Sequence, residues 1–358
     1  MPAVKARKGA SSRKKPSRMG LPMSAEGERP VDLVTHITRQ SQKQRQMVFD
    51  QVTAASRINC KGFLENRAHN RVPVPIHEKK RVLLTVVKEG DGEYFPATYA
   101  CCERDDYILT QAPTKENYCD FWRMVWRDSC KICVSLSEKL SDSDGKLCYP
   151  YWPTEQDGKL EIQGSRFVIK CQKKTDFKGY TIYDLKLNST DPSIDASSGN
   201  KSVQKDQADD EHSEDKNSRP ITLMHFERWP TDSWPDLDLL GPFVQTLSKK
   251  EIQIMRKSLD NYVPPVVIQS HDGLGRAPII WVSTILMKDI EKKECFDVED
   301  LAKKCVRARP GAFYKKIHFC VLIALAFRLS SLGGWTALAD ARAKIKDIEQ
   351  AYQASLKK

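Results

Sequence analysis

The chain has 358 residues, 40% of them hydrophobic, which is enough to bury one large core or two small ones. It contains no run of about 18 apolar residues, and its basic N-terminus lacks an apolar signal region, so we expect neither a membrane span nor a secretory signal. This composition predicts a cytoplasmic protein whose eleven cysteines are reduced thiols.

The segment 1–31 is basic, contains several serines and lacks aromatic residues. Its first thirty residues carry eight Lys and Arg against two acids, an excess of more than half the net charge of +11. Such a composition is typical of a disordered, solvated arm, so we expect a disordered tail over 1–31. No nucleic-acid-binding motif accompanies it, and we do not expect a nucleic-acid partner. The basic tail leaves a nuclear location open.

Two hydrophobic periods alternate along the rest of the chain. Apolar residues at helical spacing predict helices within residues 31–66, 120–126, 243–262 and 279–286. Short apolar or alternating runs predict strands at 132–136, 164–171, 180–187, 221–226 and 266–270. The lone C-x-x-C motif at Cys130 and Cys133 is interpreted as two buried structural thiols, and no metal site is expected.

Residues 188–219 interrupt these patterns. They contain eight acids, four bases and no Phe, Tyr or Trp. Such a segment cannot bury enough apolar surface to offset the entropy lost on ordering it. We therefore expect a disordered insertion at the tip of a hairpin, where long loops are tolerated because closure entropy grows slowly with length.

The most informative stretch is Val266–Pro278, in which an apolar strand runs into a glycine loop and then into an amphipathic helix. Backbone N–H groups in such a loop converge on one point, and the helix adds its positive N-terminal end. Arg276 adds a planar guanidinium that binds phosphate oxygens in pairs. The loop is not a Walker loop, because no Gly-Lys-Ser/Thr follows, and Pro278 replaces the third glycine of a dinucleotide fingerprint. It predicts a phosphate-binding loop, with an ordinary tight turn as the alternative.

This loop resembles the protein tyrosine phosphatase signature, His-Cys-x-x-Gly-x-Gly-Arg-Ser/Thr-Gly. The segment Asp120–Trp126, with the sequence DFWRMVW, is the most specific further match, and 94–113 and 306–329 resemble other family motifs. The resemblance covers roughly residues 32–332 and implies an α/β fold, with a central twisted mixed sheet flanked by helices on both faces. It implies neither a cofactor nor a metal. Residues 333–358 lie beyond it and are expected to form a helical tail rich in Ala and Lys.

The resemblance assigns eight residues to the phosphate loop. They are Gln269, Ser270, His271, Asp272, Gly273, Leu274, Gly275 and Arg276. Ser270 stands where the family has its nucleophilic cysteine, and Gln269 replaces the histidine before it. A serine hydroxyl is a far weaker acid than a thiol and needs an adjacent general base, for which His271 is the only nearby candidate. A Ser–His pair inside one tight loop points its side chains in different directions, so we do not expect Ser–His catalysis.

The family's general acid is also replaced, in one of two registers. Thr231 takes its position if Trp229-Pro230 is the family's Trp-Pro-Asp motif, whereas Trp234-Pro235-Asp236 would make Asp236 the acid. The first register is preferred, because the second lies too far beyond the preceding strand. A threonine cannot protonate a leaving group near neutral pH.

The pocket positions implied by the resemblance differ as well. Val72 replaces the tyrosine that walls the phosphotyrosine pocket, and Tyr314 and His318 replace the glutamines that position the hydrolytic water. Asp272 replaces a small residue that contacts the substrate ring, where a carboxylate repels a dianion. Because Arg276 and the glycines remain, we expect weak anion binding, no tighter than about millimolar.

These replacements imply a pseudophosphatase, a catalytically inactive phosphatase-like domain that acts as a binding or scaffold module. Its expected partners are proteins, with phosphorylated proteins and kinases as candidates. The alternative is a tyrosine phosphatase with residual or altered activity through unorthodox residues. The combination of a basic tail and a diverged domain is similar to the expanded nematode branch of the family.

Overall fold

The computed structural model describes residues 59–86, 90–102, 105–138, 140–141, 148–162, 167–190, 217–257, 263–294 and 297–357. The expected tail over 1–31, the helices expected before residue 59 and most of the expected insertion lie outside these residues. Within the described ranges, no helix is long and apolar enough to cross a membrane.

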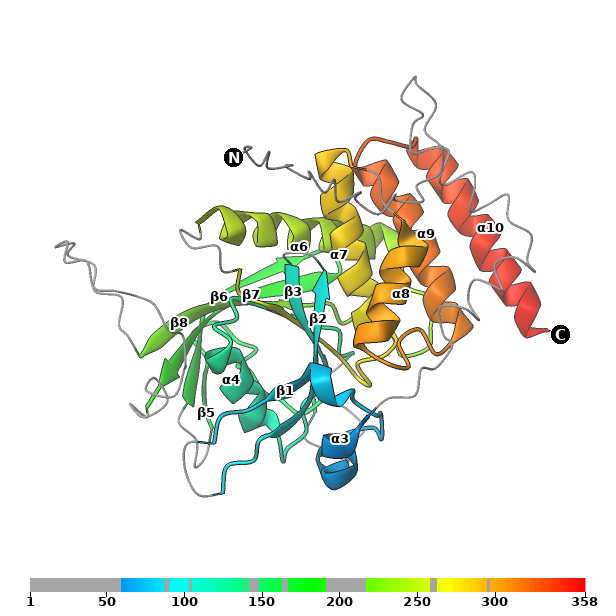
Figure 1. The fold of residues 1–358 in the computed structure, drawn as a ribbon. Coiled ribbons are helices and arrows are strands. Elements are labelled where there is room, and N and C mark those ends of the chain that lie inside the picture. Colours follow the sequence, from blue (N-terminus) through cyan, green and yellow to red (C-terminus); the bar gives the residue numbers. More distant parts are fainter. Residues whose placement is uncertain are drawn as a thin grey trace, which may run out of the picture.

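One mixed sheet runs through the described part of the chain (Figure 1). Its strands, in spatial order, are β1 (Arg81–Leu83), β2 (Tyr94–Cys102), β3 (Asp105–Gln111), β9 (Val266–Ser270), β4 (Ile132–Ser135), β8 (Ser218–His225), β7 (Tyr180–Ser189), β6 (Phe167–Phe177) and β5 (Lys159–Glu161). The central strands β3, β9, β4 and β8 run parallel, and the strands on both sides pair antiparallel. Parallel strands are covered on both faces, which explains why all five residues of β9 are buried.

Helices cover both faces of this sheet (Figure 1). One face carries α4 (Tyr118–Arg127), and the other side carries α6 (Leu237–Lys257), α7 (Arg276–Lys292), α8 (Val298–Ala308), α9 (Lys316–Leu332) and α10 (Leu338–Leu356). The short helices α3 (Lys61–Glu65), η1 (Arg67–His69) and η2 (Glu78–Lys80) precede β1. Successive strand residues face opposite cores, so Val266 and Ile268 pack on the α7 side and Val267 on the α4 side. The expected fold class is confirmed.

The helix α4 is enclosed on more sides than its spacing predicts. Its fully buried side chains are Phe121, Trp122, Met124, Val125 and Trp126. Trp122 and Trp126 add to the predicted face, since Trp126 packs on Phe167 of β6 with ring centroids 5.7 Å apart, and the segment after residue 148 covers Trp122. There, the indole N–H of Trp122 donates to the backbone oxygen of Tyr151 at 2.8 Å, and the ring of Tyr151 packs on Phe121.

The hairpin of β7 and β8 is longer than predicted. Its register pairs Asn188 with Ser218, and the N–H of Ser189 donates to the backbone oxygen of Asn217 at 2.8 Å. The expectation of disorder over 188–219 is therefore wrong at both ends of that range, because backbone pairing extends a strand without requiring apolar side chains. Residues 191–216 lie outside the described part of the chain.

The C-terminal helix α10 exists as expected, but it packs against the domain. Ala341 and Ile348 are buried in the core that also contains α9. At its outer side, Asp238 in the first turn of α6 binds Arg328 of α9 at 2.9 Å and Arg342 of α10 at 2.8 Å. The helix is therefore a structural part of the domain.

Cys130 and Cys133 are free and buried, as interpreted from the sequence. Burial raises the pKa of both thiols, so they remain protonated at neutral pH. In the portion of the chain that is described, no group of three or more His, Cys, Asp or Glu side chains is placed to hold a metal ion.

Candidate functional site

The glycine loop joins the carboxyl end of β9 to the start of α7, in the parallel part of the sheet. Binding sites of open α/β sheets lie at this edge. Gly273 has a φ of 68°, and a Cβ there would lie 2.9 Å from the backbone oxygen of Thr110. A Cβ on Gly275 would lie 2.6 Å from Nε2 of His318. Position 273 therefore requires glycine, whereas a Cβ at position 275 would have to displace the ring of His318.

Ser270 is fully buried, and its hydroxyl oxygen accepts the N–H of Gly273 at 3.1 Å. Among the hydrogen bonds of the described residues, none joins this hydroxyl to a histidine. Burial and the nearby Arg71 lower the pKa of His271, so that its ring is neutral at pH 7. The structure thus places Ser270 against the loop backbone rather than against a general base.

Gln269 connects the loop strand to its neighbour. Its side-chain amide donates to the hydroxyl of Ser135 at 2.6 Å and to that of Ser137 at 2.8 Å. Ser135 ends β4, and the backbone oxygen of Ser137 lies 2.7 Å from the ring of His225 at the end of β8. All of these groups are buried, where polar atoms require partners, so Gln269 has a structural role.

The carboxylate of Asp272 lies over the backbone of its own loop. Its Oδ1 accepts the N–H of Leu274 at 2.9 Å and the N–H of Gly275 at 3.3 Å. Burial raises the pKa of this carboxyl, but the two N–H donors and the hydroxyl of Tyr314 outweigh burial and bring it below its ordinary value. Asp272 is therefore ionised at neutral pH.

Arg276 begins α7 and is 5% exposed. One nitrogen, Nη1, donates to the backbone oxygen of Trp229 and lies 3.5 Å from Oε1 of Glu138. The other, Nη2, donates to the hydroxyl oxygen of Thr231 at 3.1 Å. The two guanidinium nitrogens that would bind two oxygens of an oxyanion thus donate to the segment 229–231 instead.

The segment from Trp229 to Asp236 forms a loop, which we call the acid loop after its expected role. In it, the N–H and the hydroxyl of Thr231 both donate to Oε1 of Glu138, the hydroxyl at 2.8 Å. Asp232 follows with a φ of 60° and pairs with Lys315. The acid loop is therefore attached at three points to residues around the glycine loop.

The two possible registers of the acid loop differ in which residue takes the general-acid position, Thr231 or Asp236. The hydroxyl of Thr231 is in contact with the guanidinium of Arg276. Asp236 lies at the start of α6, where its Oδ1 accepts the N–H of Asp238 at 2.9 Å as a helix cap. The structure brings Thr231 to the loop and leaves Asp236 at a helix terminus.

Tyr314 and His318 lie together beside the glycine loop, with ring centroids 5.1 Å apart. Tyr314 is 44% exposed, and burial with nearby carboxylates, including Asp272, raises the pKa of its hydroxyl. His318 is buried against Gly275, and burial lowers its pKa to about 4. At neutral pH this site therefore contains a neutral imidazole and a protonated phenol.

Val72 is fixed by the end of β3. Its N–H donates to Oε1 of Gln111 at 3.0 Å, and Nε2 of Gln111 donates back to the backbone oxygen of Val72 at 2.8 Å. Gln111 pairs with Ser270 in the β3–β9 register, so this anchor adjoins the glycine loop. The side chain at this position is aliphatic, whereas the resemblance implies a tyrosine here in active family members.

Sequence reasoning missed the residue beneath the loop, Arg309. It is completely buried, and its Nη2 lies 3.1 Å from where a Cβ of Gly273 would be. Its Nη1 donates to the hydroxyl of Thr98 at 2.7 Å, while Nε and Nη2 have no hydrogen-bond partner among the described residues. Burial lowers the pKa of Arg309 to about 10, which leaves it charged at neutral pH. The Arg-Pro-Gly sequence that begins at Arg309, directly after α8, was the available signal.

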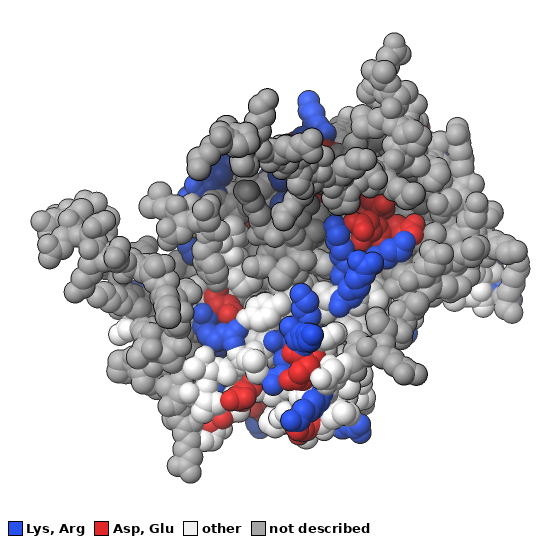
Figure 2. Space-filling model, viewed as in Figure 1, with Lys and Arg blue, Asp and Glu red and all other residues white. Residues whose placement is uncertain are grey.

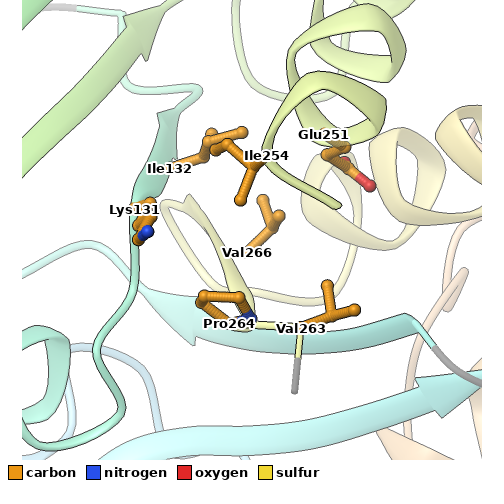
Figure 3. Close-up of a pocket in the computed structure, with 7 residues that line it drawn as sticks. All are labelled: Lys131, Ile132, Glu251, Ile254, Val263, Pro264 and Val266. Carbon is orange, nitrogen blue, oxygen red and sulfur yellow. The ribbon is translucent and has the colours of Figure 1, made fainter. Parts of the chain in front are cut away.

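A hollow lies at the amino ends of the central strands β4 and β9, away from the glycine loop (Figure 3). Its lining residues are Lys131, Ile132, Glu251, Ile254, Val263, Pro264 and Val266. In Figure 3 the carboxylate of Glu251 points away from Lys131. That carboxylate binds Nζ of Lys288 and the hydroxyl of Tyr107, each at 2.7 Å. Its role is therefore to pair with polar groups inside the core.

Comparisons with known proteins agree with this geometry. The family model for protein-tyrosine phosphatase matches residues 66–328. The "Probable tyrosine phosphatase protein N1" of Microplitis demolitor bracovirus is 26% identical over 265 residues, which are 72% of this chain and 74% of that protein. "Tyrosine-protein phosphatase 3" of Dictyostelium discoideum is 27% identical over 245 residues, 66% of this chain but 21% of that protein. A family model that matches most of the chain, over a fold and a loop of the expected form, leads to one conclusion: the chain belongs to the protein-tyrosine phosphatase family.

Proposed function

We propose that this chain is a catalytically inactive member of its family, a pseudophosphatase that serves as a binding or scaffold module. The observation that carries the proposal is the hydroxyl of Ser270, which lies at the nucleophile position and accepts a hydrogen bond from the N–H of Gly273. In the family, a cysteine thiolate attacks phosphorus from this position. A buried serine hydroxyl at neutral pH requires a general base to attack in the same way.

The side chains near Ser270 are poor general bases. The carboxylate of Asp272 is engaged by two backbone N–H groups, and its lowered pKa makes it a weak proton acceptor. His271 is neutral, but no hydrogen bond between described residues joins it to the Ser270 hydroxyl. These contacts support the loss of nucleophilic attack.

The leaving-group step lacks a suited acid as well. Thr231 contacts Arg276 through a hydroxyl, which does not release a proton near neutral pH. Its neighbour Asp232 is paired with Lys315, and Asp236 caps α6. Tyr314 and His318 replace the residues that hold the hydrolytic water in the family. We therefore propose that both chemical steps are lost.

A second candidate function is phosphatase activity that is residual or altered. The intact course of the glycine loop favours it, as does the contact of Arg276 with the acid loop through the backbone oxygen of Trp229. Relatives such as the bracovirus protein are also named as phosphatases. This candidate requires Asp232 or Asp236 to leave its present partners and reach the loop.

For the inactive module, we propose a protein partner in the cytoplasm, with phosphorylated proteins and kinases as candidates. On the face shown in Figure 2, basic and acidic side chains of described residues lie next to one another. On α8, for example, Lys304 pairs with Asp300 at 2.9 Å. A mixed surface of this kind favours a protein partner over nucleic acid, which is bound by fields of one sign.

Hydrolysis of p-nitrophenyl phosphate and of a phosphotyrosyl peptide by the purified full chain tests the proposal. Arg276→Met is the matched control, because it removes the guanidinium on which any phosphate chemistry in this loop depends. We expect the wild-type protein to release no more phosphate than the control. Phosphate release that is present in the wild type and lost in Arg276→Met would establish the second candidate instead.

A further inference from the structure

The glycine loop uses its own N–H groups internally. The N–H of Gly273 binds the hydroxyl of Ser270, and the N–H groups of Leu274 and Gly275 bind the carboxylate of Asp272. These three consecutive amides are the groups that a loop before a helix N-terminus offers to an anion. Their partners are side chains that lie two or three residues earlier in the same loop.

Positive charge gathers around this carboxylate from two sides. Arg276, at the start of α7, and Arg309, beneath Gly273, are both buried and both interact electrostatically with Asp272. Arg309 is the more telling of the two, because its Nε and Nη2 have no hydrogen-bond partner among the described residues. A completely buried cation with unsatisfied nitrogens requires an anion nearby, and Asp272 is the charged group that the loop supplies.

We propose that Asp272 is the resident anion of the phosphate loop and that its carboxylate excludes tetrahedral oxyanions from it. This inference rests on the proposed function and deepens it, because it names the residue that closes the pocket to phosphate. An incoming oxyanion has to take the N–H groups of Leu274 and Gly275 from Asp272 while remaining next to its negative charge. The carboxylate of Asp272 therefore keeps phosphate out of the loop.

The inference corrects the expectation of weak anion binding. That expectation counted the glycines and Arg276 as available, whereas the amides bind Asp272 and the guanidinium binds Trp229 and Thr231. Both kinds of anion-binding group are thus engaged within the protein. Wild-type protein is expected to bind no phosphate at millimolar concentrations, and a partner must engage another surface.

The test is calorimetric titration of the full chain with inorganic phosphate at constant ionic strength, with sodium chloride as the reference salt. The wild type should show no saturable binding up to 20 mM phosphate. This limit is well above the dissociation constant of about 1 mM that a weak anion site would have. Asp272→Ala should bind phosphate saturably, with a Kd at least tenfold below that upper concentration. The additional change Arg276→Met should abolish that binding.

Asp347→Ala is the matched control, because it removes one negative charge from the exposed face of α10, away from the loop. It should leave phosphate binding unchanged. If Asp272→Ala fails to fold, as judged by circular dichroism, Asp272→Asn keeps the side-chain shape without the charge and should show the same saturable binding.

Two results would overturn the inference. One is a wild type that binds phosphate as tightly as the Asp272 variants, and the other is a folded variant that binds no better than Asp347→Ala. Neither result bears on turnover, which is measured separately on an aryl phosphate. Failure of this inference is thus distinguishable from failure of the proposed function.

Discussion

Nη2 of Arg276 donates a hydrogen bond to the hydroxyl oxygen of Thr231 at 3.1 Å. The same hydroxyl donates to Oε1 of Glu138 at 2.8 Å, so one threonine joins the phosphate loop, the acid loop and the segment after β4. Thr231 therefore acts as a structural link. Its contacts attach the acid loop to Glu138 and to Arg276.

Thr231→Val tests the strength of this link. The substitution keeps the shape of the side chain but removes the hydroxyl, leaving Glu138 and Arg276 each without one partner. We expect the free energy of unfolding to fall by about 1 kcal/mol, the usual net contribution of such hydrogen bonds. Urea unfolding of both proteins measures the difference.

Thr181→Val is the matched control, because it removes a surface hydroxyl that binds Asp176 within the β6–β7 hairpin. It should cost less than half as much as Thr231→Val. Equal losses in the two variants would show that the acid loop gains nothing from its contact with Arg276.

Much of the fold was predictable because local patterns determine it. The apolar run of β9 and the glycines that follow it specify a strand, a tight loop and a helix start, all of which the structure contains. The motif Asp120–Trp126 identified a buried helix, although its two tryptophans pack on separate segments that no local pattern could place beside it. Hairpin length was underestimated for the same reason, since register depends on the partner strand.

The site was predictable as a set of positions but not as a set of contacts. The sequence pointed to Asp272 as an unfavourable charge, whereas its hydrogen bonds depend on where the loop backbone directs its N–H groups. Glu138 and Arg309 lie far apart in the sequence, and only the fold brings them to the same loop. Side-chain direction and long-range proximity are the information that a local pattern lacks.

His318 makes stability depend on pH. Its pKa falls from about 6.5 in the unfolded chain to about 4 in the folded protein, mainly through burial. Between these values the unfolded state binds more protons, so stability is lost as the pH falls. Linkage gives a loss of about 2 kcal/mol for this residue between pH 7 and pH 5. Urea unfolding at both pH values should show a smaller loss in His318→Gln than in the wild type.

The exposed His69 provides the control for this measurement. His69→Gln should retain the pH dependence of the wild type. His271 and His225 have pKa values lowered by burial as well, so part of the loss should persist in His318→Gln. An unchanged pH dependence in His318→Gln would contradict the burial of a neutral imidazole against Gly275.

The packing of α10 predicts that a change far from the loop destabilises the domain. Ile348 is 7% exposed and lies in the core shared with α9. Ile348→Ala should lower the free energy of unfolding by at least about 2 kcal/mol, as for other buried aliphatic truncations. Gln353→Ala, at an exposed position of the same helix, should change it by less than about 0.5 kcal/mol. Equal, small effects would mean that α10 is a detached tail.

The pairing at the end of the β7–β8 hairpin predicts that residues 191–216 are dispensable for folding. Asn188 and Ser218 are already paired, so a short turn can connect the two strands. A chain in which Asn-Gly replaces 191–216 should unfold within about 1 kcal/mol of the wild type, because loop length contributes little to stability. A larger loss in thermal unfolding would show that the removed segment contacts the domain.

Turnover by Ser270→Cys tests the central claim most directly. The claim is that activity is lost at several positions, so restoring the nucleophile alone does not restore the reaction. A cysteine here would lack the N–H groups that Asp272 occupies, and Thr231 would still supply no proton. The triple variant Ser270→Cys, Asp272→Ala, Thr231→Asp restores thiol, cradle and acid together, and it provides the positive arm.

The measurement is kcat/KM for p-nitrophenyl phosphate. We predict that Ser270→Cys shows no turnover above the wild type, while the triple variant hydrolyses the ester measurably. Turnover by the single variant that approaches the rate of an active family member would contradict the account, because it would show that the acid, the cradle and the water site remain functional in this chain.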